Sequence, residues 1–126
     1  MIIALVVDDE SDVKLLFQQQ FRKEIKGGQI KFYFALSGEE ALKYLQSEDM
    51  ASMVLILSDI NMPGMSGLEL LKIIKEQYSH LKVFMLTAYG DDKNYQTAMS
   101  YGADDYINKP IEFSELKKKV LSFQYL

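Results

Sequence analysis

The sequence predicts an α/β fold in which helices cover both faces of one parallel five-stranded sheet. Short apolar runs of strand length recur five times along the chain, and segments whose apolar residues have helical spacing separate them. Three of these runs are too continuous for a strand with one face in water, which favours strands buried on both sides. Regular alternation of strand and helix is typical of right-handed βαβ units, and such units build parallel sheets.

The five predicted strands are bounded by turn or capping residues and lie at Ile2–Val7, Ile30–Ala35, 53–57, 82–86 and 105–107. For this alternation we expect the strand order 2-1-3-4-5, as in flavodoxin-like folds. Sheets of this kind bind ligands beyond the carboxyl ends of their strands, at the point where the strand order reverses. Here that point lies between the first and the third strand.

A helix is predicted after each strand, because each of these segments begins with a residue that commonly opens helices. The expected opening residues are, in chain order, Ser11, Ser37, Ser66 and Asp91 or Asp92, and Ser114 should lie near the start of the last helix. The first helix should end at Gly27 and Gly28. Its buried face should consist of Val13, Leu16, Phe17 and Phe21.

The composition is that of one globular domain. The 126 residues carry 18 acidic and 14 basic side chains, a net charge of −4, so the chain as a whole offers no nucleic-acid surface. The lack of cysteine excludes disulfides and fits a reducing compartment, and no apolar run approaches the length of a membrane span. We therefore expect a single cytoplasmic domain over residues 1–126, without nucleic-acid or membrane binding and without an output domain in this chain.

Polar side chains gather where the predicted strands end. They are Asp8, Asp9 and Glu10, then Asp59, Thr87 and Lys109. Because the carboxyl ends of parallel strands meet at one edge, we expect the three aspartates, the hydroxyl and the ammonium to converge, with Glu10 capping or facing water. Carboxylates this close repel one another unless a hard divalent cation neutralises them. Without histidine or cysteine the cluster suits Mg²⁺ rather than zinc, and phosphate is its natural guest.

Five short motifs occur along the chain: LVVDDE at 5–10, SGEEAL at 37–42, DINMPGMSG at 59–67, LTA at 86–88 and GADDYINKP at 102–110. In this order and spacing they resemble the receiver domains of two-component response regulators, over nearly the whole chain. Each motif alone would be a weak match, but five in order make a specific one. Ser66 departs from the family, which often has an acidic residue before the glycine at this point.

The resemblance implies a role for each residue of the cluster. Asp59 would be the phosphoacceptor for a phosphohistidine on a sensor histidine kinase or phosphotransfer protein. Asp8, Asp9, Asp59 and the main-chain carbonyl of Asn61 would hold Mg²⁺. Lys109 would pair with the phosphoryl oxygens, and Thr87 would hydrogen-bond one of them. The protein would then be a signalling domain that catalyses only its own phosphorylation and dephosphorylation.

The resemblance also implies a switch. Thr87 would turn toward the phosphoryl group, and the ring of Tyr106 would follow it inward, changing the face formed by the fourth helix, the last strand and the last helix for partner binding or dimerisation. The family suggests a cis peptide bond between Lys109 and Pro110. Asn61 and Tyr89 flank the path of hydrolytic water in relatives and would tune the phosphoryl lifetime.

Other functions are compatible with parts of the sequence. A degenerate receiver would dock partners without phosphorylation, although every expected polar residue is present. A phosphatase with an aspartate nucleophile would need a second acid at position 61, where the chain has asparagine. A flavin or nucleotide carrier on the same fold would need a phosphate-binding loop where Asp8, Asp9 and Glu10 stand, and these acids would repel phosphate.

Overall fold

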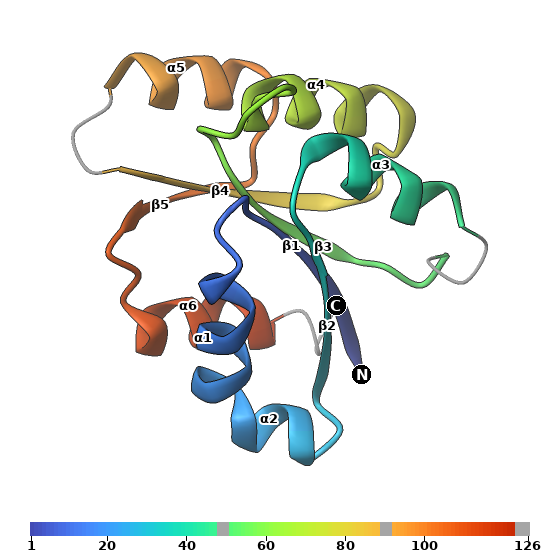
Figure 1. Ribbon diagram of the computed structural model, residues 1–126, viewed down its shortest axis with the longest axis vertical. Coiled ribbons are helices and arrows are strands. Elements are labelled where there is room, and N and C mark those ends of the chain that lie inside the picture. Colours follow the sequence, from blue (N-terminus) through green and yellow to red (C-terminus); the bar gives the residue numbers. More distant parts are fainter. Residues whose placement is uncertain (48–50, 89–91, 123–126) are drawn as a thin grey trace.

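The computed structural model describes residues 1–47, 51–88 and 92–122, and it confirms the predicted fold. Five parallel strands form one sheet in the order β2-β1-β3-β4-β5 (Figure 1). Their bounds are β1 Ile2–Val7, β2 Ile30–Ala35, β3 Leu55–Asp59, β4 Lys82–Ala88 and β5 Asp105–Lys109. The helices of the described residues are α1 Asp12–Gln20, α2 Arg22–Lys26, α3 Gly38–Gln46, α4 Gly67–Gln77, α5 Asp92–Ser100 and α6 Phe113–Leu121.

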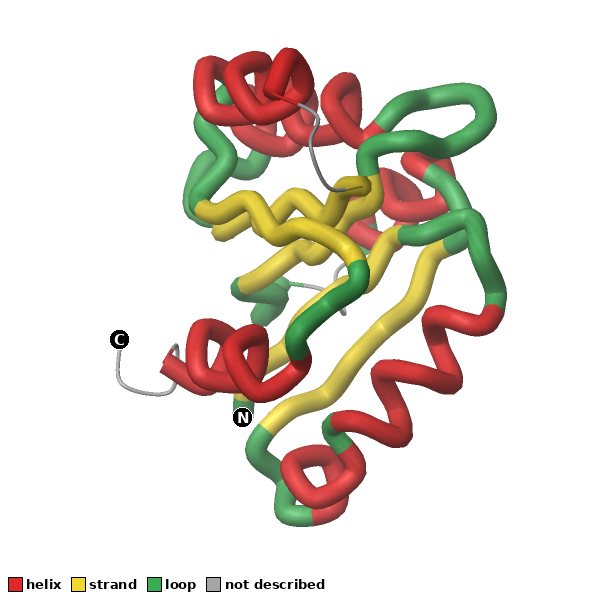
Figure 2. Tube along the Cα trace, turned by 90° about the vertical axis from the view of Figure 1, so that its left-hand side faces the viewer, coloured by secondary structure: helices red, strands yellow, loops and turns green. Residues whose placement is uncertain are grey.

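Two apolar cores lie on opposite faces of the sheet. One core packs α3, α4 and α5 against side chains such as Leu5, Ile56 and Met85. The other packs α1 and α6 against the alternate residues of the same strands, such as Ala4 and Leu57. Figure 2 shows the strands between these two groups of helices. Successive side chains of a strand point to opposite faces of the sheet, so alternate residues of each strand enter the two cores.

The first helical segment differs from the prediction in two ways. It is not continuous: α1 ends at Gln20, and α2 begins at Arg22, after Phe21 has left helical geometry with φ −103° and ψ 19°. The Phe21 ring is fully buried and stacks on Phe17, so core packing holds the residue at which the helix breaks. In addition, Leu16 is exposed, not buried as expected.

The capping residues were predicted with mixed success. The hydroxyls of Ser37 and Ser66 accept hydrogen bonds from the main-chain N–H groups of Glu40 and Glu69, as N-caps do. Ser11 makes no such bond, because its own backbone is already helical. The α5 helix begins at Asp92 within the described residues, and Asp91 lies outside them.

Gly67 allows α4 to begin directly against the end of β3. Its N–H donates to the Ile60 carbonyl at 2.8 Å, which closes the loop of residues 61–66 at its base. A Cβ atom at this position would overlap the Asp59 carbonyl oxygen and lie 2.8 Å from Ile60 Cα, which is main chain and cannot move aside cheaply. Absence of a side chain at residue 67 is therefore a condition for this connection.

Among the described residues, no helix has both the length and the apolar content that crossing a bilayer requires.

Candidate functional site

The predicted site residues meet at the carboxyl edge of the sheet. Asp8 follows β1, and Asp59 is the last residue of β3; the register pairs Val7 with Ser58, so the two strands end side by side. The apolar run alone placed the end of β3 at residue 57, but Ser58 and Asp59 stay in the ladder, with Asp59 opposite Leu86 of β4. Thr87 and Lys109 likewise belong to β4 and β5 themselves.

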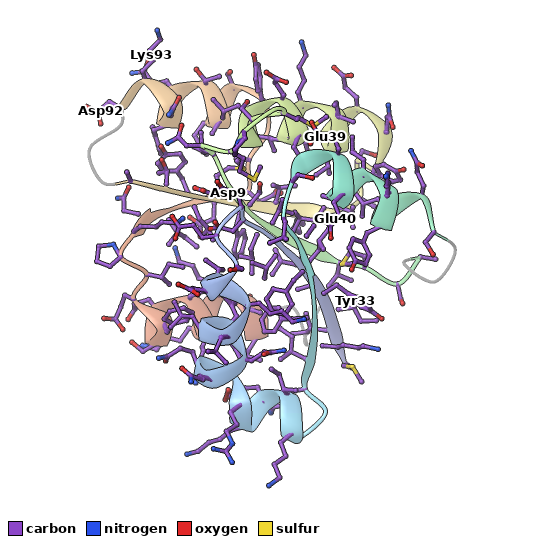
Figure 3. All side chains as sticks on the ribbon, in the orientation of Figure 1. Asp9, Tyr33, Glu39, Glu40, Asp92 and Lys93 are labelled. Carbon is purple, nitrogen blue, oxygen red and sulfur yellow. The ribbon has the colours of Figure 1, made fainter. Side chains whose placement is uncertain are left out.

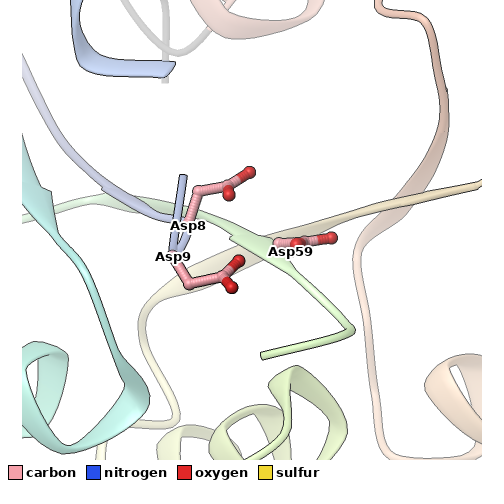
Figure 4. Close-up of side chains that lie close together, drawn as sticks. All are labelled: Asp8, Asp9 and Asp59. Atoms are coloured by element: carbon pink, nitrogen blue, oxygen red, sulfur yellow. The ribbon is translucent and has the colours of Figure 1, made fainter. Parts of the chain in front are cut away.

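Three aspartates form one acidic cluster. Asp8, Asp9 and Asp59 each offer a carboxylate oxygen, and these oxygens lie within 4.8 Å of one another. Figure 4 shows the side chains of Asp8 and Asp9 leaving the end of β1 and extending to the same side as Asp59. Asp8 and Asp59 are buried, whereas Asp9 is exposed. Glu10 is outside this cluster and exposed, as expected.

One ammonium group partly balances the cluster. Lys109 Nζ lies 3.0 Å from Asp8 Oδ2 and 3.3 Å from Asp59 Oδ1. Burial alone would lower the pKa of the Lys109 ammonium, but its contacts with the two carboxylates outweigh burial and raise that pKa above its ordinary value. Lys109 is therefore charged at neutral pH. The peptide bond between Lys109 and Pro110 is cis, as the family resemblance suggested.

The carboxyl group of Asp59 is held in an unfavourable environment for a charge. Burial raises its pKa, and the neighbouring Asp8 carboxylate raises it further, although Lys109 and the N–H of Ile60 act in the opposite direction. The N–H of Ile60 donates to Asp59 Oδ1 at 2.9 Å, and the buried Ser58 hydroxyl donates to the Asp59 carbonyl at 3.0 Å. Backbone and neighbours thus fix the orientation of a carboxylate whose ionisation the site opposes.

Thr87 contributes a buried hydroxyl group at the end of β4. The residue is fully buried, and Oγ1 has no hydrogen-bond partner among the described residues. An unpaired buried hydroxyl costs free energy, so Thr87 is suited to bind a ligand that enters the site. An acidic oxygen cluster, a lysine and a spare hydroxyl donor fit a hard cation together with an anionic oxygen guest.

The remaining predicted residues are Asn61, Tyr89 and Tyr106. Asn61 lies in the loop after β3 and is exposed, and Tyr89 lies outside the described residues. Tyr106 is half-buried on β5, with its ring edge-on to Tyr95 of α5 at a centroid separation of 5.1 Å. Its ring therefore lies at the junction of α5 and β5.

Sequence reasoning missed one side chain at this edge, Glu39. Its Oε1 accepts a hydrogen bond at 3.0 Å from the N–H of Met65, in the loop that follows β3. In the sequence Glu39 is simply an acidic residue in the first turn of a helix, which the helix dipole explains by itself.

The comparisons with known proteins agree with this site. A family model described as the response regulator receiver domain matches residues 4–121. The chain therefore belongs to the family of response regulator receiver domains of two-component systems. This is a signalling family.

Relatives and solved structures show the same likeness. The chain is 40% identical over 110 residues to the DNA-binding transcriptional regulator NtrC of Proteus hauseri, covering 87% of this chain and 22% of that protein. The structure is similar to the CheY-like receiver of Methanospirillum hungatei, with a TM-score of 0.85, 28% identity and 99% and 97% of the two chains covered.

A third similar protein was solved with ligands. It is the response regulator TrrA of Thermotoga maritima, described as a complex with Mg(2+)-BeF; its TM-score is 0.78 and its identity 35%, with 97% and 98% of the two chains covered. The chain spans less than half the length of the curated relatives it matches.

Proposed function

We propose that this receiver domain accepts a phosphoryl group on Asp59, in a Mg²⁺-dependent transfer from a phosphohistidine of a sensor histidine kinase or phosphotransfer protein. The proposal rests on the excess of negative charge in the site. Three carboxylates face one ammonium beside a buried hydroxyl that lacks a partner among the described residues. This arrangement of charged and polar groups is unfavourable in the free protein, and it becomes favourable once a cation and phosphoryl oxygens bind.

Asp59 is oriented for attack on phosphorus. Among the described residues, the contacts to its carboxylate both end on Oδ1, one from the N–H of Ile60 and one from Lys109 Nζ. Oδ2 is therefore the oxygen we assign as nucleophile. It forms the new bond to phosphorus, the bond from phosphorus to the imidazole nitrogen breaks, and the electron pair leaves with the imidazole. Phosphoryl transfer depends mainly on positioning and electrostatics, which a carboxylate at the end of a buried strand satisfies.

The oxygen donors at the strand ends fit Mg²⁺. Asp8, Asp9, Asp59 and the main-chain carbonyl of Asn61 would hold the ion, which supplies neutralisation of charge on the transferring oxygens. Lys109 would shift from its contact with Asp59 toward those oxygens, since it is the charged donor nearest to the acceptor. The Thr87 hydroxyl, which has no partner among the described residues, would donate to one of them.

The same hydroxyl connects the site to a distant surface. When Thr87 moves toward the phosphoryl group, it vacates space beneath β4, and the half-buried ring of Tyr106 would turn inward to occupy it. Because Tyr106 packs on Tyr95, this movement would change the face formed by α5, β5 and α6 for partner binding or dimerisation. Asn61 and Tyr89 would tune the lifetime of the phosphoryl group, by orienting or blocking the hydrolytic water.

A small phosphodonor tests the proposal directly. Incubation with acetyl phosphate and Mg²⁺, followed by intact mass measurement, should show the gain of one phosphoryl group. Asp59→Asn should abolish the gain and a chelator should prevent it. Asp104→Asn, which removes a carboxylate at the opposite edge of the sheet, should still be phosphorylated. An Asp59→Asn protein that gains the same mass would disprove the assignment of the acceptor.

A further inference from the structure

The loop of residues 61–66, which connects β3 to α4, is held at two places. At its base the N–H of Gly67 donates to the Ile60 carbonyl at 2.8 Å. Near its far end the N–H of Met65 donates to Glu39 Oε1 of α3 at 3.0 Å, across 26 positions of the sequence. This second contact joins the loop to α3, so it fixes the loop relative to the rest of the domain.

The packing around this hydrogen bond is close. A Cβ atom at Gly38 would lie 2.8 Å from Met65 Sδ and 3.1 Å from its Cβ and Cγ, so the methionine side chain rests closely on the first turn of α3. Gly64 has a positive φ of 74°, and a Cβ atom there would lie 3.1 Å from Glu39 Oε1. The loop backbone therefore turns directly around the Glu39 carboxylate.

The neighbouring Glu40 takes part in the N-terminal cap of α3. Its N–H donates to the Ser37 hydroxyl at 3.1 Å, which is the N-cap bond of α3, and its Oε2 accepts from the N–H of Leu36, the residue before the cap, at 3.3 Å. Figure 3 labels both glutamates in the first turn of α3. Since Ser37 and Glu40 already cap this helix, the bond from Glu39 to Met65 is not needed to begin it.

The carboxylate of Glu39 is well suited to this contact. Hydrogen bonds from its own main-chain N–H and from that of Met65 lower the pKa of Glu39, so the side chain is ionised at neutral pH. A charge-assisted hydrogen bond is stronger than a neutral one.

We propose that Glu39 is a positioning residue for the metal site: by holding Met65 it fixes the loop in which Asn61 presents its main-chain carbonyl to Mg²⁺. The inference rests on the proposed function, because it assumes that the carbonyl of Asn61 is a ligand. Asn61 follows the acceptor by two residues and lies between the two points at which the loop is held. Loss of the far point would leave the carbonyl free to move away from the ion.

Mg²⁺ binding, measured by isothermal titration calorimetry, tests the inference without any phosphoryl transfer. Glu39→Ala should weaken the affinity about three- to tenfold, at or below the low end of the loss seen when outer-shell partners of metal ligands are removed. Glu39→Gln keeps an oxygen acceptor for Met65 and should recover most of the affinity. Glu40→Ala removes the same charge from the same turn and should bind Mg²⁺ as the wild type does, although its melting temperature falls.

Each result decides a different point. If the wild-type protein binds no Mg²⁺, the proposed function fails. If the wild type binds and Glu39→Ala binds equally well, the function stands and the positioning role is wrong. If Glu39→Gln or Glu40→Ala is as weak as Glu39→Ala, the effect is one of charge and the positioning role is again wrong.

Discussion

The two edges of the sheet each gather charged side chains, but they balance them differently. At the edge where the strands begin, Asp104 Oδ2 accepts from Lys75 Nζ at 2.7 Å and from the N–H of Val83 at 2.8 Å. Lys75 Nζ also donates to the Leu81 carbonyl at 2.9 Å. At the edge where the strands end, three carboxylates gather, and within the described residues Lys109 pairs with two of them, Asp8 and Asp59.

The difference separates a structural cluster from a functional one. Around Asp104 opposite charges and main-chain groups satisfy one another, so the cluster holds α4 and β4 together without outside help. Around Asp59 the charges are in excess, and desolvation adds to their repulsion. A cluster that lowers the stability of the free protein is expected where binding of an ion and an anion repays the cost.

Breaking the balanced edge should have the largest effect on stability. Asp104→Ala removes the acceptor for Lys75 and for the N–H of Val83, and should lower the free energy of unfolding by about 1–3 kcal/mol. Urea denaturation measures this loss. Mg²⁺ affinity should stay unchanged in this variant, and a weakened affinity would mean that the two edges are coupled.

Removing a charge from the unbalanced edge should act in the opposite direction. Because the folded state raises the pKa of Asp59, ionisation of this group costs stability, and the cost grows as the pH rises through the interval between the ordinary pKa and the raised one. Without Mg²⁺, Asp59→Asn should therefore raise the melting temperature at pH 7 by a few degrees. The gain should vanish as the pH falls to the ordinary range for aspartate, about 4.

The same pH series carries its own control. Asp104→Asn also removes one carboxylate, but from a paired position, so its melting temperature at pH 7 should fall. A lower melting temperature for Asp59→Asn at pH 7 would show that the Lys109 contact outweighs burial and the repulsion from Asp8.

The smallest effect is expected for the buried Thr87 hydroxyl, which has no partner within the described part of the chain. Thr87→Val replaces that hydroxyl with a methyl group and should leave the free energy of unfolding unchanged or raise it by up to about 1 kcal/mol. Ser58→Ala is the matched control, because its buried hydroxyl donates to the Asp59 carbonyl, and it should cost about 1 kcal/mol. A clear loss of stability in Thr87→Val, seen by urea denaturation, would mean that the hydroxyl is bonded in the free protein.

The sequence predicted the fold and most of the site because both depend on local patterns. Apolar runs and capping serines mark the elements, and parallel topology then brings the ends of the strands to one edge. This placed Asp8, Asp9, Asp59 and Lys109 together without any knowledge of distances. The family motifs added the roles of these residues, which phosphorylation and Mg²⁺-binding measurements test.

The features that were missed depend on packing between distant segments. Phe21 has good helical spacing, and only its burial among other phenylalanine rings reveals why the helix breaks there. Ser58 and Asp59 look like the start of a turn, yet pairing with β4 keeps them in the sheet. Glu39 meets Met65 only once α3 and the loop after β3 have packed.

Gly67 is essential to the connection between β3 and α4, although it has no reactive side chain. The residue contributes no charge, no donor side chain and no ligand, but any larger residue there would collide with the main chain of Asp59. A substitution at this position would displace the main chain of Asp59 while leaving every polar side chain of the site unchanged. Any redesign of the loop after β3 therefore has to keep glycine at this position.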